Sequence, residues 1–462
     1  MPFAAFAAEI TFSVTASSPP RVVSTASGDR VTAEGDWDVL REPGYPELPF
    51  RVVSVLLPQG QTAAGITVTA STPRPAGTAL HPALVEPYTT DDGHVVEPAT
   101  SFTTAGVFPA ARARLLGVGY SNGYAIASVA VYPFELNQGE LRCFERIDVV
   151  VSTRPEDTAP VVRERFREGF HESMRARLEK LVVNPELIDS YAIGQHVVPK
   201  PHGFQPTSFP SLEGSAVDYV IVTTDALAAS YQPLADWKTQ KGVPTVIRTV
   251  EWIAANTRNG SDLQETIRNF AIEAYAKWGI TYLLLGGDTD QIPVRMAYSA
   301  FYDGGKELPV DMYFGNLDGD WNGDHDSVWG EFGVDAADLY AEVYIGRLPS
   351  RNPAEVGVLV NKVIDYERPV FRTYAKKILL LGEVLFPADY DPGDPISLNG
   401  ADLFDYLRQA YMTSPALSVT PMYETPALFP GPPPAIQLSH AATMDSLDVG
   451  YNHVAQIGHG FR

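Results

Sequence analysis

The stretch Tyr282-Leu283-Leu284-Leu285-Gly286-Gly287-Asp288 is a short apolar run that ends in two glycines and an acid. Unbroken apolar runs of this length are typical of strands that are buried on both faces of a parallel sheet. A helical pattern over 262–278, closed by Gly279, comes directly before it. This order of helix and buried strand predicts βαβ units, in which helices cover both faces of a mostly parallel sheet.

The same alternation continues on both sides of this strand. Tyr219-Val220-Ile221-Val222 and Pro244-Thr245-Val246-Ile247 predict two earlier strands, and Ile378-Leu379-Leu380-Leu381-Gly382-Glu383 predicts a later one. Further helices are predicted over 227–241, over 353–366 and near 401–411, and a terminal strand is predicted over 454–457. We therefore expect an α/β domain over 216–462, with a first subdomain at 216–370 and a second at 371–462.

Residues 1–153 predict an all-β domain. Short runs such as Ile10-Thr11-Phe12-Ser13-Val14 and Ile66-Thr67-Val68-Thr69 are separated by Gly, Pro and Asp at intervals that are typical of strands. The single cysteine, Cys143, falls in one such run and is expected to be an ordinary strand residue.

Residues 154–215 are predicted to connect the two domains. Val162, Phe166, Phe170, Met174 and Leu178 recur every four residues and predict one helix. The Pro-rich, polar stretch over 197–214 predicts an exposed segment, which is either a site of proteolytic processing or a plain linker.

The composition excludes several classes of protein. The chain has 462 residues, of which 45% are hydrophobic and 19% charged, as in folded multidomain proteins. Lys and Arg number 34 against 56 Asp and Glu, which gives a net charge of −22. This balance argues against nucleic acid as a partner and suits a protein that binds divalent cations. No segment approaches the ~20 apolar residues of a membrane span.

The start of the sequence, Met1-Pro2-Phe3-Ala4-Ala5-Phe6-Ala7-Ala8-Glu9, has no basic leader, but its Ala-x-Ala ending resembles the tail of a signal peptide. We expect a secreted or cell-surface protein whose signal peptide is clipped or mis-started. An Ala-rich terminal tail is the alternative interpretation.

The loop Asp318-Gly319-Asp320-Trp321-Asn322-Gly323-Asp324-His325-Asp326 carries oxygen side chains at alternate positions. Such a loop can encircle Ca²⁺, because carboxylates crowded together otherwise repel. Compared with an EF-hand loop, the twelfth position is Trp329, and Glu331 comes two residues late. We predict Ca²⁺ ligands of another loop type at Asp318, Asp320, Asn322, Asp324, Asp326 and Glu331, against the alternative of a solvated acidic turn.

Two further residues follow predicted strands. Glu383 ends one apolar run, and His459 lies between Gly458 and Gly460 directly after the terminal run. Ligands of parallel sheets bind beyond the carboxyl ends of the strands. A carboxylate there can orient an imidazole and fix its tautomer if the two strand ends are neighbours. The alternatives are a solubilising acid and an exposed histidine.

Together these stretches resemble the gingipain family of cysteine peptidases, which have a caspase-like fold. The β-rich region with Pro43-Gly44-Tyr45-Pro46-Glu47-Leu48-Pro49 resembles the propeptide domain of that family. The resemblance to the catalytic domain is carried by Pro233-Leu234-Ala235-Asp236-Trp237-Lys238, Gly242-Val243, Ile267-Arg268-Asn269-Phe270, Leu285-Gly286-Gly287-Asp288, Ile292-Pro293 and Val343-Tyr344-Ile345-Gly346-Arg347-Leu348-Pro349.

The resemblance implies a secreted endopeptidase in zymogen-like form that acts on proteins or peptides. It implies that His459 is the base, that Glu383 supports it, that Gly460 lies beside the oxyanion hole, and that the acidic loop binds calcium. The nucleophilic cysteine of the family follows the histidine strand, whereas Cys143 lies in the propeptide-like region. We therefore expect the chain as given to be inactive, as a truncated enzyme.

Other interpretations stay open. The main alternative is a non-catalytic, calcium-stabilised surface or binding protein on a peptidase scaffold. A carbohydrate-binding β module fused to an α/β hydrolase lacks a Gly-x-Ser-x-Gly elbow. The sequence does not choose among Asp389, Asp391, Asp394 and Asp402 as an acid that selects basic substrates, and it does not indicate an oligomeric state.

Overall fold

The structure is a computed structural model that describes residues 7–16, 19–25, 28–40, 45–78, 88–89, 95–96, 106–163, 165, 167, 169–194, 217–299, 306–331, 334–338, 340–368, 372–387 and 389–459. The chain forms two compact units, Met1–Glu367 and Arg368–Arg462, so the division falls close to the subdomain boundary expected at 370/371. The predicted processing segment at 197–214 lies outside the described residues. In the part of the chain that is described, no helix is both long and apolar enough to cross a membrane.

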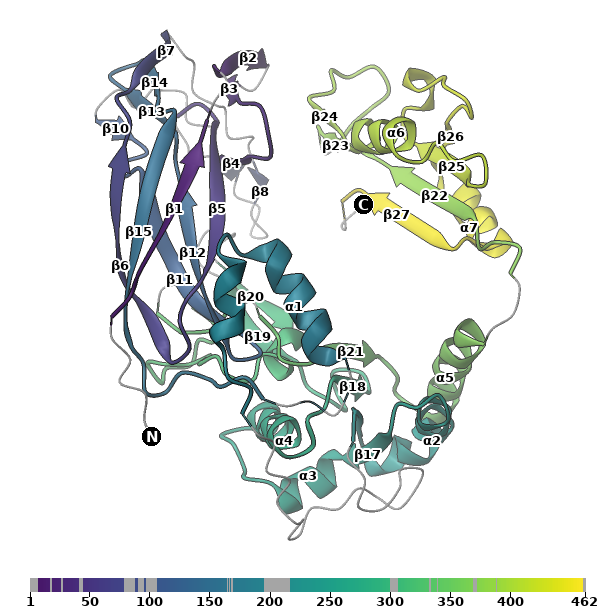
Figure 1. The fold of residues 1–462 in the computed structure, drawn as a ribbon. Helices are drawn as coiled ribbons and strands as arrows, with labels where there is room; N and C mark the ends of the chain where they lie inside the picture. Colours follow the sequence, from purple (N-terminus) through teal and green to yellow (C-terminus); the bar gives the residue numbers. More distant parts are fainter. Residues whose placement is uncertain are drawn as a thin grey trace. The chain divides into compact units, whose positions relative to one another are not determined.

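The N-terminal region is all-β, as predicted (Figure 1). Two sheets, β1-β15-β6 and β11-β12-β5-β4, contribute to one apolar core, and a third sheet has the order β10-β13-β14-β7. In β15 alternate residues, among them Ile147, Val149 and Val151, are buried in that core, as the two-residue period of a strand requires. The strands are β1 (Glu9–Thr15), β2 (Arg21–Thr25), β3 (Gly28–Thr32), β4 (Asp38–Leu40), β5 (Leu48–Leu56), β6 (Gln61–Ala70), β7 (Arg74–Thr78), β8 (Tyr88–Thr89), β9 (Val95–Val96), β10 (Val107–Phe108), β11 (Ala113–Ser121), β12 (Tyr124–Val131), β13 (Phe134–Asn137), β14 (Glu140–Cys143) and β15 (Arg146–Pro155).

The connector contains a shorter helix than predicted. Helix α1 spans Phe170–Leu181, so the prediction that the helical pattern began at Val162 was wrong. Gly169 has a left-handed φ of 76°, and the carbonyl of Val162 accepts a hydrogen bond from the N–H of Gly194 instead of continuing a helix. Val162 still packs in one apolar cluster with Met174 and Leu178. A 3₁₀ turn, η1 (Pro185–Ser190), follows.

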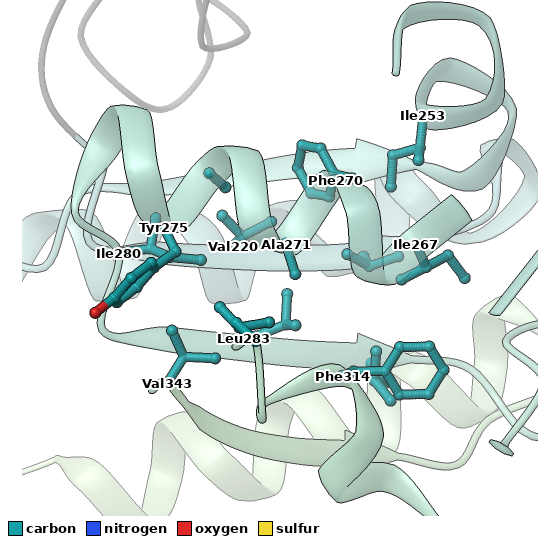
Figure 2. Packing of buried hydrophobic residues seen from close by; sticks show 14 of the residues in the cluster. Val220, Ile253, Ile267, Phe270, Ala271, Tyr275, Ile280, Leu283, Phe314 and Val343 are labelled. Carbon is teal, nitrogen blue, oxygen red and sulfur yellow. The ribbon is translucent and has the colours of Figure 1, made fainter. Parts of the chain in front are cut away.

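The first α/β sheet is fully parallel and has the order β17-β16-β18-β21. Helices α2 and α5 supply the apolar cluster on one face, and α3 and α4 supply the cluster on the other (Figure 2). This confirms the predicted α/β fold class with helices on both faces. The elements are β16 (Tyr219–Thr223), α2 (Asp225–Gln240), β17 (Thr245–Thr249), α3 (Val250–Asn256), α4 (Leu263–Trp278), β18 (Tyr282–Gly286), β21 (Tyr344–Leu348) and α5 (Pro353–Glu367).

Helix α4 illustrates why these residues form these elements. The side chain of Asp262 accepts a hydrogen bond from the N–H of Glu265 at 2.7 Å and caps the first turn. Gly279 ends the helix in the left-handed conformation, with φ of 68°. Between the caps, Ile267, Phe270 and other apolar residues at helical spacing face the sheet (Figure 2).

An excursion between β18 and β21 carries the acidic loop. It contains the antiparallel pair β19 (Arg295–Ser299) and β20 (Lys306–Val310), followed by the 3₁₀ turn η2 (Asp311–Phe314). The guanidinium group of Arg347 in β21 binds the carboxylate of Asp311 at 2.7 and 2.8 Å. This ion pair fixes η2, which comes before the acidic loop, against the sheet.

The second unit has its own parallel sheet, in the order β26-β25-β22-β27 (Figure 1). Helix α6 contributes to the cluster on one face and α7 to the cluster on the other. Among the described residues β26 and β27 are the two edge strands of this sheet. The elements are β22 (Lys377–Gly382), β23 (Val384–Phe386), β24 (Leu398–Asn399), α6 (Gly400–Ala410), β25 (Ser418–Tyr423), η3 (Pro426–Leu428), β26 (Ile436–Gln437), α7 (His440–Val449) and β27 (His453–Ile457).

The hairpin between β11 and β12 joins the β-rich region to the acidic excursion. The N–H of Tyr120 donates to Asp338 at 2.6 Å, and the N–H of Asn122 donates to Glu342 at 3.3 Å. Gly119 permits this close approach, because a Cβ there would lie 2.7 Å from the ring of Tyr340.

Arg165 strengthens the same junction. Its side chain is buried, with 7% exposed, and donates to the side chain of Asn122 and to the carbonyls of Ile280 and Glu342. Its guanidinium carbon also lies 4.5 Å from the ring centroid of Tyr275. One buried cation therefore satisfies acceptors from both the β-rich region and the α/β region.

We predict that Arg165→Ala lowers the free energy of unfolding of this unit by about 3 kcal/mol, because it leaves buried carbonyls without a charged donor. The thermal midpoint should fall, and proteases should cut the β-rich region earlier in a time course. Arg154→Ala is the matched control, since the side chain of Arg154 is 61% exposed and makes a single ion pair at 3.9 Å. Equal effects of the two substitutions would contradict the role given to Arg165.

Candidate active site

The site in the second unit begins with the pairing of two strand ends. Strands β22 and β27 are parallel, and Gly382 lies opposite Ile457. The next residue, Glu383, donates its N–H to the carbonyl of Ile457 at 2.9 Å and accepts from the N–H of Gly400 at 2.9 Å. Its main chain is thus bound to the end of β27 and to the start of α6. The structure therefore brings Glu383 and the segment of His459 together at one edge of the sheet.

The half-buried His459 is in contact with Glu383 and Leu385 at this edge. Its main-chain N–H donates to Glu383 Oε2 at 3.1 Å. Its ring Nε2 lies 2.6 Å from the carbonyl oxygen of Leu385. The ring of Phe386 packs edge-to-face on the imidazole, with centroids 5.6 Å apart. The hydrogen bond at 3.1 Å thus joins the Glu383 carboxylate to the main chain of His459, and the predicted role of Glu383 in orienting the imidazole stays a prediction.

Gly458 has a steric role in this arrangement. A Cβ atom at this position would lie 2.5 Å from Glu383 Cδ, inside any allowed contact distance. The glycine therefore leaves the space that the carboxylate occupies over the end of β27. Gly460, predicted to lie beside an oxyanion hole, is outside the described residues.

Cys143 lies in β14, as expected for an ordinary strand residue. It is paired with Phe134 on one side and Arg74 on the other. Its side chain is buried, and burial raises the pKa of the thiol. A thiol of this kind is mostly protonated at neutral pH and is a poor nucleophile.

The predicted calcium ligands divide into two groups. Carboxylate oxygens of Asp324, Asp326 and Glu331 lie within 4.8 Å of one another near the surface. Partial desolvation, followed by the charges of Asp326 and Asp324, raises the pKa of Glu331. Asp320 and Asn322 lie in the same loop, where Asp320 accepts from the N–H of Asn322 at 3.1 Å and Asn322 donates to the carbonyl of Asp326 at 3.0 Å.

Asp318 belongs to the second group, which also contains Asp338 and Glu342. Both oxygens of Asp318 are shielded from solvent, and none of the described residues gives them a hydrogen bond when the carboxylate is ionised. Burial is the main cause that raises the pKa of all three acids, and the charges of Glu342 and Asp338 raise that of Asp318 further. The carboxyl group of Asp318 therefore favours a bound proton or a nearby cation.

Sequence analysis missed Asp335, Asp338, Glu342 and Glu424. The carboxylate of Asp335 holds the loop, since it accepts from the N–H groups of Gly323 and Glu331. Glu424 follows β25 and accepts from the N–H of Val384 at 2.8 Å. The sequence did contain a signal for two of these acids, because Asp338 and Glu342 lie between the acidic loop and the strand 344–348.

Comparison with known proteins identifies relatives of this chain. A gingipain R2 of Porphyromonas gingivalis is 24% identical over 153 residues, which is 33% of this chain and 17% of the relative. A Lys-gingipain of the same species is 21% identical over 218 residues, which is 44% of this chain and 11% of the relative. The chain thus spans less than a fifth of the length of these curated relatives.

The chain also matches solved structures. The complex of the pro- and mature domains of RgpB from Porphyromonas gingivalis is 20% identical, with a TM-score of 0.36, and the match covers 53% of this chain and 48% of that one. The model of peptidase family C25 matches residues 213–461, and this match confirms the resemblance inferred from the sequence. The chain belongs to peptidase family C25, the gingipain family of cysteine peptidases.

Proposed function

We propose that this chain is the zymogen-like part of a secreted cysteine endopeptidase, in which His459 is the base and Glu383 holds it in place. The observation that carries the proposal is the meeting of these two residues at the carboxyl ends of β22 and β27, with Glu383 Oε2 3.1 Å from the N–H of His459. This edge is where parallel sheets bind their ligands. Export is proposed by analogy with the gingipain family, to which the chain belongs.

The proposed chemistry is acyl transfer. The imidazole of His459 takes the proton of a cysteine thiol, and the thiolate attacks the carbonyl carbon of a peptide bond. The imidazolium then gives that proton to the leaving amine, and water hydrolyses the acyl-enzyme with the same base. Gly460 is proposed to lie beside the oxyanion hole. Cys143 is excluded as the nucleophile by its burial and its raised pKa.

The β-rich region is proposed to act as the propeptide. Support comes from its hairpin, whose N–H groups at Tyr120 and Asn122 bind acids of the α/β region. Arg165 adds buried hydrogen bonds between the β-rich region and the α/β region, and cleavage of the connector alone does not break them. We expect release of the β-rich region to need both cleavage and dissociation of this junction.

The activity test uses two polypeptides, residues 1–462 and the complete translation product of the gene. We expect 1–462 to hydrolyse no casein, because its only cysteine is the buried Cys143. The complete product should hydrolyse casein, and His459→Ala should lower kcat/KM by at least about 10²-fold, as loss of a general base does. Cys143→Ser is the control and should retain the activity.

The outcomes separate the two candidate functions. Activity of the complete product that survives His459→Ala, or no activity in any form, would contradict the peptidase proposal. An inactive product that calcium stabilises would favour the non-catalytic surface or binding protein, for which the buried Cys143 is the supporting observation.

We also propose that the acidic excursion binds structural Ca²⁺. Both acidic groups fit a hard cation that takes oxygen ligands. Asp324, Asp326 and Glu331 offer three carboxylates at the surface, with Asp320 and Asn322 in the same loop. The half-buried Asp318 and Asp338 and the buried Glu342 offer three more, and the solvent-shielded oxygens of Asp318 favour this group on physical grounds. A bound ion would offset the negative charges of these acids.

We predict that EDTA lowers the thermal midpoint of 1–462 by about 5 °C or more relative to excess Ca²⁺, as expected for a ligand at 100 times its Kd. Differential scanning calorimetry measures the shift. Asp318→Asn should abolish the response if the buried group binds the ion, and Asp326→Asn should abolish it if the surface group does. Asp290→Asn is the control, because it removes the charge of an exposed acid that belongs to neither group. No response in the wild-type protein, or a full response in both variants, would reject the calcium proposal.

A further inference from the structure

Two arginines and two tyrosines line a cavity between the connector and the first parallel sheet. Its volume is about 470 Å³, which is within the range of pockets that hold small organic ligands. Arg167 and Arg177 come from the connector, while Tyr282 and Tyr344 are the first residues of β18 and β21. We propose that this cavity binds an organic carboxylate whose body carries an aromatic ring. The proposal does not rest on the peptidase activity, whose candidate residues lie in the second unit.

The polar groups of this cavity are hydrogen-bond donors. Arg177 donates to the hydroxyl oxygen of Tyr344 at 2.9 Å, and Arg167 donates to that of Tyr282. A guanidinium group has no acceptor, so each tyrosine uses its oxygen as the acceptor and keeps its O–H proton for another partner. Each arginine also has N–H groups beyond the one that binds the tyrosine. Guanidinium and hydroxyl donors that converge in this way are typical of a site for a carboxylate.

The charge of the cavity is opposite to that of the chain. The net charge is −22, yet neither Arg167 nor Arg177 forms an ion pair within 4 Å with any of the described residues. Asp218 is close enough to Arg167 for their charges to interact, but it is 3% exposed and is not among the described residues that line the cavity. Arg175, on the same helix, is instead paired with Glu179 at 2.9 Å. A ligand carboxylate can therefore bind the two arginines of the cavity without displacing an acid of the chain.

The other walls of the cavity fit an aromatic ring. Phe170 and the buried Met174 contribute apolar side chains from α1. The rings of Tyr282 and Tyr344 are stacked, with centroids 5.6 Å apart and an interplanar angle of 26°. Tyr344 is 54% exposed, so a ligand ring has an aromatic face to contact. A second cavity of about 210 Å³ shares Phe170, Met174 and Tyr344 as walls and provides room for the rest of the ligand.

The position of the cavity in the fold gives binding a structural consequence. Tyr282 and Tyr344 lie at the amino ends of their strands, whereas parallel sheets usually bind ligands at the carboxyl ends. The arginines belong to the connector and the tyrosines to the sheet, so one bound carboxylate contacts both parts of the chain. The site is therefore complete only while the connector packs against the sheet, and the ligand stabilises that packing.

The test is isothermal titration calorimetry of the chain 1–462 with N-acetyl-phenylalanine, which carries a ring and a carboxylate. We expect a Kd of about 1 mM or lower, as is usual for a ligand of this size. The uncharged N-acetyl-phenylalaninamide should bind at least about tenfold more weakly, since it lacks the ionised acceptor. Raising the salt concentration from about 0.05 M to about 0.5 M should weaken binding of the acid, because salt screens exposed charges.

A second probe distinguishes two sources of the carboxylate. It is a short peptide with blocked ends and a glutamate between two phenylalanines. A similar Kd for the peptide and the free acid would assign the cavity to an acidic segment of a protein, and a much weaker Kd for the peptide would assign it to a small free acid. Equal binding of the acid and the amide, or no binding of either carboxylate at about 10 mM, would overturn the proposal. Phenyl phosphate that binds at least about tenfold more tightly than both carboxylates would overturn the choice of carboxylate.

Four variants locate the site. Arg167→Gln and Arg177→Gln should each raise the Kd of N-acetyl-phenylalanine by at least about tenfold, because each removes a charged donor. Tyr344→Phe should raise it by about threefold, since it removes one O–H donor and keeps the ring. Lys180→Gln is the matched control: it removes a positive charge from the same helix at an exposed position outside the cavity. Equal losses in Arg177→Gln and Lys180→Gln, with thermal midpoints unchanged, would mean that the charge of the helix attracts the ligand and would contradict the site.

Discussion

Main-chain hydrogen bonds between β22 and β27 create the candidate site. In parallel strands both carboxyl ends face the same edge, so Gly382 opposite Ile457 forces Glu383 and His459 to be neighbours. The N–H of Glu383 extends the pairing by one more bond to Ile457. A shift of one residue in this register would turn each side chain of β27 to the opposite face and remove His459 from the carboxylate. The apolar residues of β22, among them Leu379 and Leu380, hold the register because both faces are buried.

Carboxylates of this chain bind main-chain N–H groups repeatedly. Glu383, Glu424, Asp335, Asp338 and Glu342 each accept at least one such bond, so part of the net charge of −22 is used to fix loops and strand ends. A carboxylate that accepts N–H bonds is stabilised in its charged form. Asp318 is different, because the described residues give its ionised oxygens no donor. This contrast distinguishes Asp318 from the acids that accept hydrogen bonds from main-chain N–H groups.

Sequence reasoning succeeded where local chemistry determines the element. The ends of helix α4 were predicted almost to the residue from its caps, Asp262 and Gly279, and strand β18 was predicted from its apolar run. Such signals are local, because a cap or an apolar run determines the structure of only a few neighbouring residues. Sequence reasoning did not predict strand β25. Pro421 lies in this strand opposite Leu380, and proline is not expected in an inner strand because it cannot donate a main-chain hydrogen bond. Sequence reasoning also missed the contact of the Leu385 carbonyl with the ring of His459, since every residue has a carbonyl and only the fold selects one.

The acids that border Asp318 also join the β-rich region to the α/β region. Asp338 and Glu342 accept the N–H groups of Tyr120 and Asn122, while Glu342 also accepts the N–H of Leu317, next to Asp318. The same carboxylates therefore determine both the shape of the acidic excursion and the surface on which the hairpin docks. Buried acids whose charge is uncompensated repel one another, and that repulsion would push apart the elements that carry them. Neutralising this group, by protons or by a cation, thus favours the docked arrangement and the folded excursion together.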